Sequence, residues 1–335
     1  MRSFQLDMED PTTIANGTAS IVSTADHKLI SFLSTWVLIP QILFGSGGNI
    51  LNLIVLLNKA MRSKTNIIFA AMALSDLTFL LLQSSGVLFF TGILMNNQWF
   101  RQHKLYFNFL LNWFSTTSIW LMTYATLERV QVIRSPFRSS NRHVSVRFLL
   151  SLAVIWILAL VISFYHLIPR THIRLIQSLT YINTVLVVYG PLVICTCSNW
   201  HLVQALRTNN KNWNELDDTQ THQQALFRSR AQVERKVTIV VSAIITCFVV
   251  FNVPSAVLYI VQNFVSDPHN LRFASAKAIS NTLAIMGKVL NFVLFFLTSE
   301  HFRNLIRTRW LACHNKKRRS SWKSQKTASL PLDLM

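Results

Sequence analysis

Five polar side chains lie inside long apolar runs of this chain, where a polar group is costly and is therefore a candidate for function. They are Asn49, Asp76, Ser118, Lys288 and Asn291. Asp76 and Lys288 carry opposite charges, so they could form an ion pair or belong to an ion-conducting path. No nucleophile–base constellation accompanies them, because His166 and His172 are far from Asp76 in sequence. We therefore expect no enzymatic chemistry and no cofactor.

The four cysteines are expected to be free and to bind no metal. Cys195, Cys197 and Cys247 lie in apolar runs and Cys313 lies in a basic tail, so none is placed for a disulfide on an outside face. The spacing Cys195-x-Cys197 could suggest half of a metal site. Positions two apart on a helix point to different faces, however, and no histidine lies one turn away, so core packing is the preferred interpretation.

Long apolar segments must position these residues. Of the 335 residues, 51% are apolar and 13% are charged, which is about half the roughly 25% charged residues of a soluble domain. This composition excludes intrinsic disorder and argues against a soluble nucleic-acid-binding protein. Seven segments reach the roughly 20 residues that a membrane-spanning helix needs. They cover approximately 29–57, 67–95, 105–127, 148–168, 179–203, 237–264 and 273–298. We predict an all-α membrane protein whose seven-transmembrane helix bundle occupies residues 29–298.

The basic residues predict the orientation of the bundle. With the N-terminus outside, 23 of the 32 Lys and Arg residues fall in segments that face the cytoplasm and 8 fall in segments that face outward. This asymmetry is the one that the positive-inside rule requires. The formal charge of +19 is then explained by contact with anionic lipid on the inner side, and it needs no nucleic-acid partner.

The orientation assigns a place to each end of the chain. Residues 1–28 form an extracellular tail that carries Asn16 in an N-glycosylation sequon. In residues 299–311, apolar side chains recur at helical spacing among arginines, which predicts a short amphipathic helix on the membrane surface. Residues 312–335 form a basic cytoplasmic tail. We expect a multi-pass protein of the plasma membrane.

Short motifs follow one another in a recognisable order along the spans. They are Gly48-Asn49-x-x-Asn52, Leu74-Ser75-Asp76-Leu77, Trp99, Glu128-Arg129-Val130, Pro136-Phe137, Trp156, Pro191, Phe248 with Pro254, Asn291-Phe292-x-x-Phe295 and Phe302-Arg303. In this order and spacing the chain resembles the rhodopsin-like G-protein-coupled receptors, over roughly residues 29–310. The forms around Gly48 and Asn291 look most like invertebrate FMRFamide-type neuropeptide receptors.

The resemblance implies a coupling site for a heterotrimeric G protein. Glu128 and Arg129 stand where the family has its Asp/Glu-Arg-Tyr triplet, and Glu234 stands where its ionic lock places an acid. A pair between Arg129 and Glu234 would hold the third and sixth helices together until the sixth helix opens about Pro254. The alternative is that Glu234 is a solvated charge beside Arg235 and Lys236.

The resemblance also implies a sodium site lined by Asp76, Ser118 and Asn291. Lys288 lies three residues before Asn291 and so on about the same helix face. We predict that the Lys288 ammonium pairs with Asp76 and replaces the sodium ion, which would make the receptor insensitive to sodium. The alternative is that Lys288 snorkels or faces another helix.

Departures from the family pattern bear on signalling. Asn252 stands where most members have a tryptophan switch in the sixth span, so Phe248 is expected to transmit more of the signal. Asn199 and Phe295 stand where two tyrosines usually meet. Lys104 stands where the family has its outer cysteine, so the usual disulfide is missing.

The expected ligand is a peptide that binds a basic outer mouth. Leu111 replaces the acid that grips the ammonium of biogenic amines. The mouth is formed by Lys104, Arg170, Arg174, Arg272 and Lys277. The alternative interpretation is that these residues are ordinary solvated loop charges.

For the whole protein, a non-signalling scavenger receptor and a transporter or ion-conducting protein remain as alternatives. The missing inverted repeat argues against a transporter.

Overall fold

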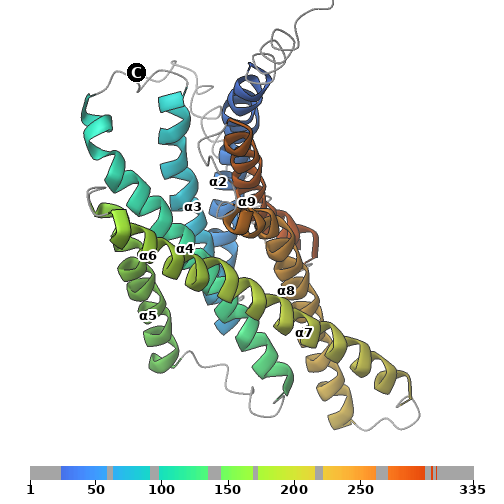
Figure 1. The fold of residues 1–335 in the computed structure, drawn as a ribbon. Coiled ribbons are helices and arrows are strands. Elements are labelled where there is room, and N and C mark those ends of the chain that lie inside the picture. The colour runs from blue at the N-terminus through green and yellow to red at the C-terminus, as the bar shows by residue number, and fades with distance from the viewer. Residues whose placement is uncertain are drawn as a thin grey trace, which may run out of the picture.

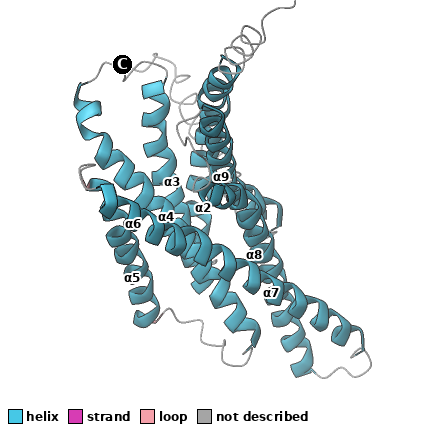
Figure 2. Ribbon diagram, in the orientation of Figure 1, coloured by secondary structure: helices cyan, strands magenta, loops and turns pink. Residues whose placement is uncertain are grey.

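The computed structural model describes residues 24–58, 63–90, 98–134, 145–168, 173–215, 222–261, 271–298, 303–304 and 307. Within these ranges the chain is almost entirely helical and contains no strand (Figure 2). The elements are a π-helical turn (Leu33–Val37), α2 (Leu38–Leu56), α3 (Lys64–Phe90), α4 (Gln98–Arg134), α5 (Val146–Ser163), a 3-10 turn (Phe164–Leu167), α6 (Ile173–Thr184), a second π-helical turn (Val185–Tyr189), α7 (Gly190–Glu215), α8 (His222–Val261) and α9 (Leu271–Thr298).

These elements form seven continuous helices, which confirms the predicted all-α seven-helix bundle. Residues 24–32, the first π-helical turn and α2 make one helix, and α6, the second π-helical turn and α7 make another. The pairs α2 and α3, α3 and α4, α4 and α5, α7 and α8, and α8 and α9 pack against each other, α2 also packs against α9, and α4 also contacts α7 and α8 (Figure 1). The third helix therefore lies at the centre of the bundle.

Several helices continue well past their apolar runs. The α4 helix has 37 residues, so it is about 55 Å long at 1.5 Å per residue. The polar segment 204–236 between the fifth and sixth spans is mostly helical, since α7 ends at Glu215 and α8 begins at His222. Hydropathy detects the part of a helix that meets lipid, whereas Gln, Lys, Arg and Glu continue a helix into water readily.

Among the residues that the structure describes, five helical segments are long and apolar enough to cross a membrane by length and composition alone. They are Thr24–Leu56, Lys64–Leu88, Val146–Leu167, Arg174–Arg207 and Arg235–Leu258. The other two helices, α4 and α9, supply Ser118, Lys288 and Asn291 to the interior. Polar groups of a membrane protein gather on the helix faces that look into the bundle.

Two apolar clusters form the core. The larger contains Met72, Leu121 and Ile244 and draws on α2, α3, α4, α5, α7 and α8. The smaller contains Phe79, Leu80 and Ile285, with Leu111 packed against it. Asp76 lies between Met72 and Phe79 on α3, so its carboxylate is placed between two apolar layers.

The α2 helix approaches α3 and α9 closely at two glycines. A Cβ added to Gly45 would lie 2.7 Å from Leu80 Cδ1, and one added to Gly48 would lie 2.7 Å from Phe292 Cβ. Gly47, between them, has nothing within 4 Å of that position. Small residues on one face allow membrane helices to pack backbone against side chain.

Candidate functional site

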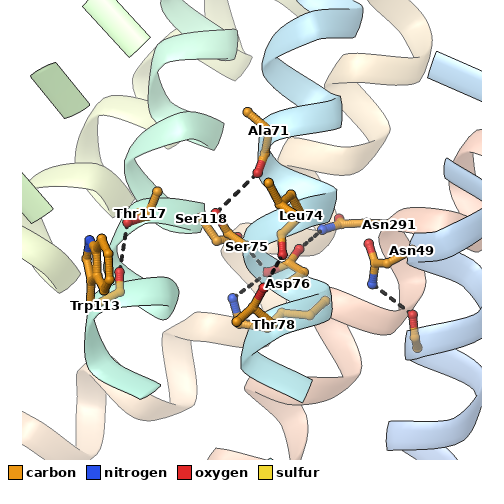
Figure 3. Close-up of polar contacts among 12 residues, drawn as sticks. Asn49, Ala71, Leu74, Ser75, Asp76, Thr78, Trp113, Thr117, Ser118 and Asn291 are labelled. Carbon is orange, nitrogen blue, oxygen red and sulfur yellow. Dashed lines mark hydrogen bonds and ion pairs between the residues drawn. The ribbon is translucent and has the colours of Figure 1, made fainter. Parts of the chain in front are cut away.

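The Asp76 carboxylate is the centre of a buried polar cluster that joins α3, α4 and α9. Asp76 is fully buried. Its Oδ1 accepts hydrogen bonds from Ser118 Oγ and from Lys288 Nζ, each at 2.7 Å, and its Oδ2 accepts one from Asn291 Nδ2 at 3.3 Å. Figure 3 shows Ser118 and Asn291 reaching Asp76 from opposite sides. The predicted central residues Asp76, Ser118, Lys288 and Asn291 are thus in direct contact.

Lys288 supplies the positive charge that this carboxylate needs. Its side chain is 12% exposed, and its ammonium also lies 5.0 Å from the centroid of the Phe79 ring, where a cation–π attraction operates. The residues do not fit a sodium ion, because a second cation next to the same carboxylate oxygen would face the ammonium at close range in a low-dielectric interior. In the structure the Lys288 ammonium is the counter-charge that contacts the Asp76 carboxylate.

Asn49 lies beside the cluster without entering it. Its Nδ2 donates to the Gly45 carbonyl one turn earlier, at 2.9 Å (Figure 3). Its Oδ1 is buried with no hydrogen-bond partner among the described residues. The Asn49 amide therefore donates within its own helix. Asn49 lies next to the cluster but does not bond to Asp76.

Arg129 is held at the end of the bundle where α4 finishes, which we call the Arg129 end. The guanidinium is 6% exposed and donates through Nε to Thr65 Oγ1 at 2.8 Å and through Nη2 to the same oxygen. Glu128 points elsewhere, and its carboxylate lies 4.0 Å from Lys64 Nζ. Both residues of the Glu128-Arg129 pair thus contact the beginning of α3.

The two polar contacts between α3 and α4 share one antiparallel register. From Thr65 to Asp76 is eleven residues along α3, and from Arg129 back to Ser118 is eleven residues along α4. Eleven residues are close to three helical turns, or about 16 Å, so both contacts fall on the same face. The central cluster and the Arg129 end therefore lie along one packed helix pair, α3 and α4.

The sixth-span residues lie in the last third of α8. Phe248 is half-buried and packs against the larger core cluster. Asn252 Nδ2 donates to the Phe248 carbonyl at 2.8 Å, within its own helix. Pro254 lies inside α8 and has no N–H to donate to the preceding turn, which weakens the helix there.

The predicted ligand residues lie at the other end of the bundle, which we call the Lys104 end. Lys104, Arg174, Arg272 and Lys277 are exposed near the starts of α4, α6 and α9. Leu111 is half-buried, about two turns deeper on α4 than Lys104, where an acid would be needed to hold an amine.

Some predicted residues lie outside the described part of the chain. They are the side chain of Glu234, Asn16 with the rest of residues 1–23, Arg170, and most of the predicted surface helix and tail. Of the surface helix, residues 303–304 and 307 are helical, and Arg303 Nη1 donates to the Phe296 carbonyl at 3.1 Å.

Sequence reasoning missed two sets of contacts, those of Thr65 with Arg129 and those of Asn199 with α8. Thr65 is a partner of Arg129, and the one hint in the sequence is that Thr65 lies as far from Asp76 as Arg129 lies from Ser118. Asn199 is a departure from the family pattern in sequence, whereas the structure shows it bonded to Ser242 and Thr246 on α8. A hydroxyl in an apolar run is common, so its residue type alone indicates little.

Comparisons with known proteins agree with this architecture. A family model described as 7 transmembrane receptor (rhodopsin family) matches residues 48–295. A Caenorhabditis elegans protein named as a putative G-protein coupled receptor is 28% identical over 342 residues, covering 88% of this chain and 79% of that protein. Galanin receptor 2a of Danio rerio is 25% identical, covering 84% and 79%. The histamine H2 receptor of Canis lupus familiaris is 23% identical, covering 87% and 82%.

A solved structure has the same fold. The crystal structure of squid rhodopsin matches with a TM-score of 0.67 at 16% identity, covering 86% of this chain and 87% of that one. The family model spans well over half of the chain, including Asp76, Arg129 and Asn291. The protein is therefore a multi-pass membrane protein that belongs to the rhodopsin family of seven-transmembrane receptors.

Proposed function

We propose that this protein is a plasma-membrane receptor that converts binding of an extracellular peptide into activation of a heterotrimeric G protein. The observation that carries the proposal is the Arg129 end. A permanently charged guanidinium is buried there and donates to the Thr65 hydroxyl of α3, in the last turns of the central helix. Such a group is held ready to exchange its contacts when a partner protein docks.

The proposed orientation places the Arg129 end in the cytoplasm and the Lys104 end outside. The distribution of Lys and Arg supports it, since 23 of 32 lie in the segments on the Arg129 side. In this orientation Glu234, near the start of the membrane-embedded part of α8, is the proposed partner of Arg129 in an ionic lock. Phe248, Asn252 and Pro254 are the proposed switch above that lock.

A peptide with acidic groups is the proposed ligand. The similarity to galanin receptor 2a supports a peptide, and the four exposed basic residues at the Lys104 end favour a negative partner. The similarity to histamine H2 receptors makes a biogenic amine the second candidate. Leu111 disfavours it, because an ammonium buried beside leucine has no counter-charge there. The narrower likeness to FMRFamide-type receptors stays a prediction.

A charge-reversed receptor tests the peptide proposal. In cells that express the wild type, we expect acidic synthetic peptides to cause separation of the G-protein subunits. When Lys104→Glu, Arg174→Glu and Lys277→Glu are combined, the potency of these peptides should fall at least about tenfold, because three attractive charges become repulsive. Subunit-separation sensors across the Gα classes give the readout.

The matched control reverses charge at the opposite end with Arg147→Glu, an exposed residue near the start of α5, and it should keep the wild-type potency for acidic peptides. Activation of the wild type by histamine, or equal potency of acidic peptides on the charge-reversed receptor, would contradict the peptide proposal. The scavenger alternative predicts uptake of peptide with no sensor signal in any Gα class. The transporter alternative is not favoured by the family match.

A further inference from the structure

A cavity of about 210 Å³ lies between the first helix, α3 and α9, toward the Lys104 end of the bundle. We call it the Gln83 cavity. The π-helical turn Leu33–Val37 and the beginning of α2 form one of its walls, and this turn packs against both α3 and α9 (Figure 1). Because π-helical turns occur often at functional sites, the position of this one directs attention to the cavity that it borders.

The lining of the cavity is polar at its deep end, which is the end farther from Lys104. Gln83 on α3 and Asn281 with Thr282 on α9 supply two carboxamides and a hydroxyl there. Closer to the Lys104 end the walls are mostly apolar and include Leu33, Val87 and Ala278. None of the residues that line the cavity is charged. The lining therefore matches a molecule with a neutral polar head and an apolar body.

A buried hydrogen-bond acceptor without a partner adjoins the deep end. Gln41 is 3% exposed, and its Nε2 donates to the Thr282 carbonyl at 3.2 Å. Its Oε1 is buried and has no hydrogen-bond partner among the described residues. Gln41 lies one turn from Leu38, and both Leu38 and Thr282 line the cavity. An unpaired buried amide oxygen is costly, so a donor that enters the deep end would relieve this cost.

We propose that the Gln83 cavity binds a small neutral molecule that carries an amide group on an apolar body. The amide N–H donates to Gln41 Oε1, the amide oxygen accepts from Gln83 Nε2, and the apolar body lies against Val87. Size agrees with this ligand, since a cavity of about 150 Å³ holds benzene and this one has room for an added amide. The inference goes beyond receptor function, because the exposed basic residues proposed to bind a peptide do not line this cavity.

The cavity lies about two helical turns from the buried ion pair, on the same helix faces. Gln83 follows Asp76 by seven residues on α3, and Asn281 precedes Lys288 by seven residues on α9. Seven residues are close to two turns, or about 10 Å. A bound molecule would therefore contact the same faces of α3 and α9 that carry the ion pair. Because it contacts three helices of the folded receptor, its binding should raise the thermal unfolding midpoint.

Benzamide is the probe that tests the proposal, since it consists of an amide group on a benzene ring. The full chain is placed in lipid nanodiscs, and binding is followed by saturation-transfer NMR of the probe and by the thermal unfolding midpoint. Empty nanodiscs measure partition of the probe into lipid. In the wild type we expect saturable binding above that background and a midpoint that rises with benzamide concentration. An absence of saturable binding would overturn the proposal.

Two charged molecules of the same size test whether the site requires a neutral ligand. Benzoate replaces the amide with a negative carboxylate, and benzamidinium replaces it with a positive group that keeps the N–H donors. Each should bind at least about tenfold more weakly than benzamide, because the lining offers no counter-charge to a buried ion. Binding of either charged molecule as tight as that of benzamide would contradict a site for neutral amides.

Filling the cavity locates the binding of benzamide. Gly86 lines the cavity, and the nearest atom to an added Cβ there is Gln83 Nε2 at 3.9 Å, so Gly86→Leu should fill the space without a clash and abolish the binding.

The matched control is Gly47→Leu, because Gly47 is exposed with nothing within 4 Å of an added Cβ; it should bind benzamide as the wild type does. Gln83→Leu should weaken binding at least about tenfold, since it removes the donor to the amide oxygen. The unfolding midpoint without probe shows that each variant folds. Equal affinity for benzamide in Gly86→Leu and the wild type would overturn the proposal. These readouts need neither a peptide nor a G protein, so they are independent of the proposed function.

Discussion

Replacing Lys288 with methionine is expected to lower the free energy of unfolding by about 3–5 kcal/mol, because removing one partner of a buried ion pair leaves the other charge uncompensated. Asp76 is fully buried, and without the ammonium its carboxylate keeps only the hydrogen bonds from Ser118 and Asn291. Asp76→Asn should cost a similar amount, because it leaves the ammonium without its carboxylate. The measurement is the thermal unfolding midpoint of the purified receptor in nanodiscs.

The double variant Lys288→Met with Asp76→Asn separates the ion pair from a general packing defect. It removes both charges, so it should recover most of the stability lost in either single variant. Lys64→Met is the matched control: its ammonium is 4.0 Å from Glu128 and the side chain is 37% exposed, so the change should cost under about 1 kcal/mol. If the stability loss of the double variant equalled the sum of the losses in the two single variants, Asp76 and Lys288 would not be energetically coupled.

Sodium gives the same pair a second test. The wild-type midpoint should be equal in sodium chloride and in choline chloride at the same ionic strength, because Lys288 already neutralises Asp76. In Lys288→Met the unpaired carboxylate should gain stability from sodium, since a cation that binds only the folded state stabilises it. Sodium-dependent stability of the wild type that disappears in Asp76→Asn would contradict the assignment of Lys288 as the counter-charge of Asp76.

Gly48→Ala is expected to destabilise the bundle by about 1–3 kcal/mol, the usual cost of overpacking. The new Cβ would lie 2.6 Å from Phe292 Cγ and 2.7 Å from Phe292 Cβ. A Cβ is fixed to its backbone, so no rotamer change relieves the contact and α2 must move away from α9. Because α9 carries Lys288 and Asn291, that displacement also loosens the Asp76 cluster. The unfolding midpoint in nanodiscs measures the loss.

Gly47→Ala, one position away, is the control. Nothing lies within 4 Å of its added methyl group, and the residue is exposed. Alanine favours a helix over glycine by up to about 1 kcal/mol, so this variant should be neutral or slightly more stable. Equal losses in Gly47→Ala and Gly48→Ala would contradict the close α2–α9 contact and point to a general effect of replacing glycine.

The central cluster could be predicted because its signals are rare. A charged residue inside an apolar run is unusual, and Asp76 and Lys288 carry opposite charges that can pair, with Asn291 one turn from Lys288. The seven helices were predictable for a similar reason, since an apolar run long enough to cross a bilayer is uncommon outside membrane spans. The charged residues and the apolar runs can each be recognised from the composition of a single segment, without knowing how the helices pack.

The contact of Arg129 with Thr65 and the bonds of Asn199 to Ser242 and Thr246 depend instead on how two helices align. Thr65, Ser242 and Thr246 are hydroxyl residues of a kind that usually bond to their own helix, as Thr117 and Thr196 do here. Only the register between helices turns them into cross-links, and register follows from packing of the whole bundle. The helix ends could not be predicted from hydropathy, because polar helix formers extend a helix with no change in the apolar pattern.

Basal guanine-nucleotide exchange in membranes tests the central claim most directly, because it requires no known ligand. The comparison uses the wild type, Glu234→Ala, and Glu234→Ala combined with Arg129→Ala, across a panel of Gα subunits and at matched surface expression. The account predicts that exchange rises in Glu234→Ala, where Arg129 is released, and is abolished in the double variant. Flat exchange in all three, with expression confirmed, would contradict the claim that this receptor activates a G protein through Arg129.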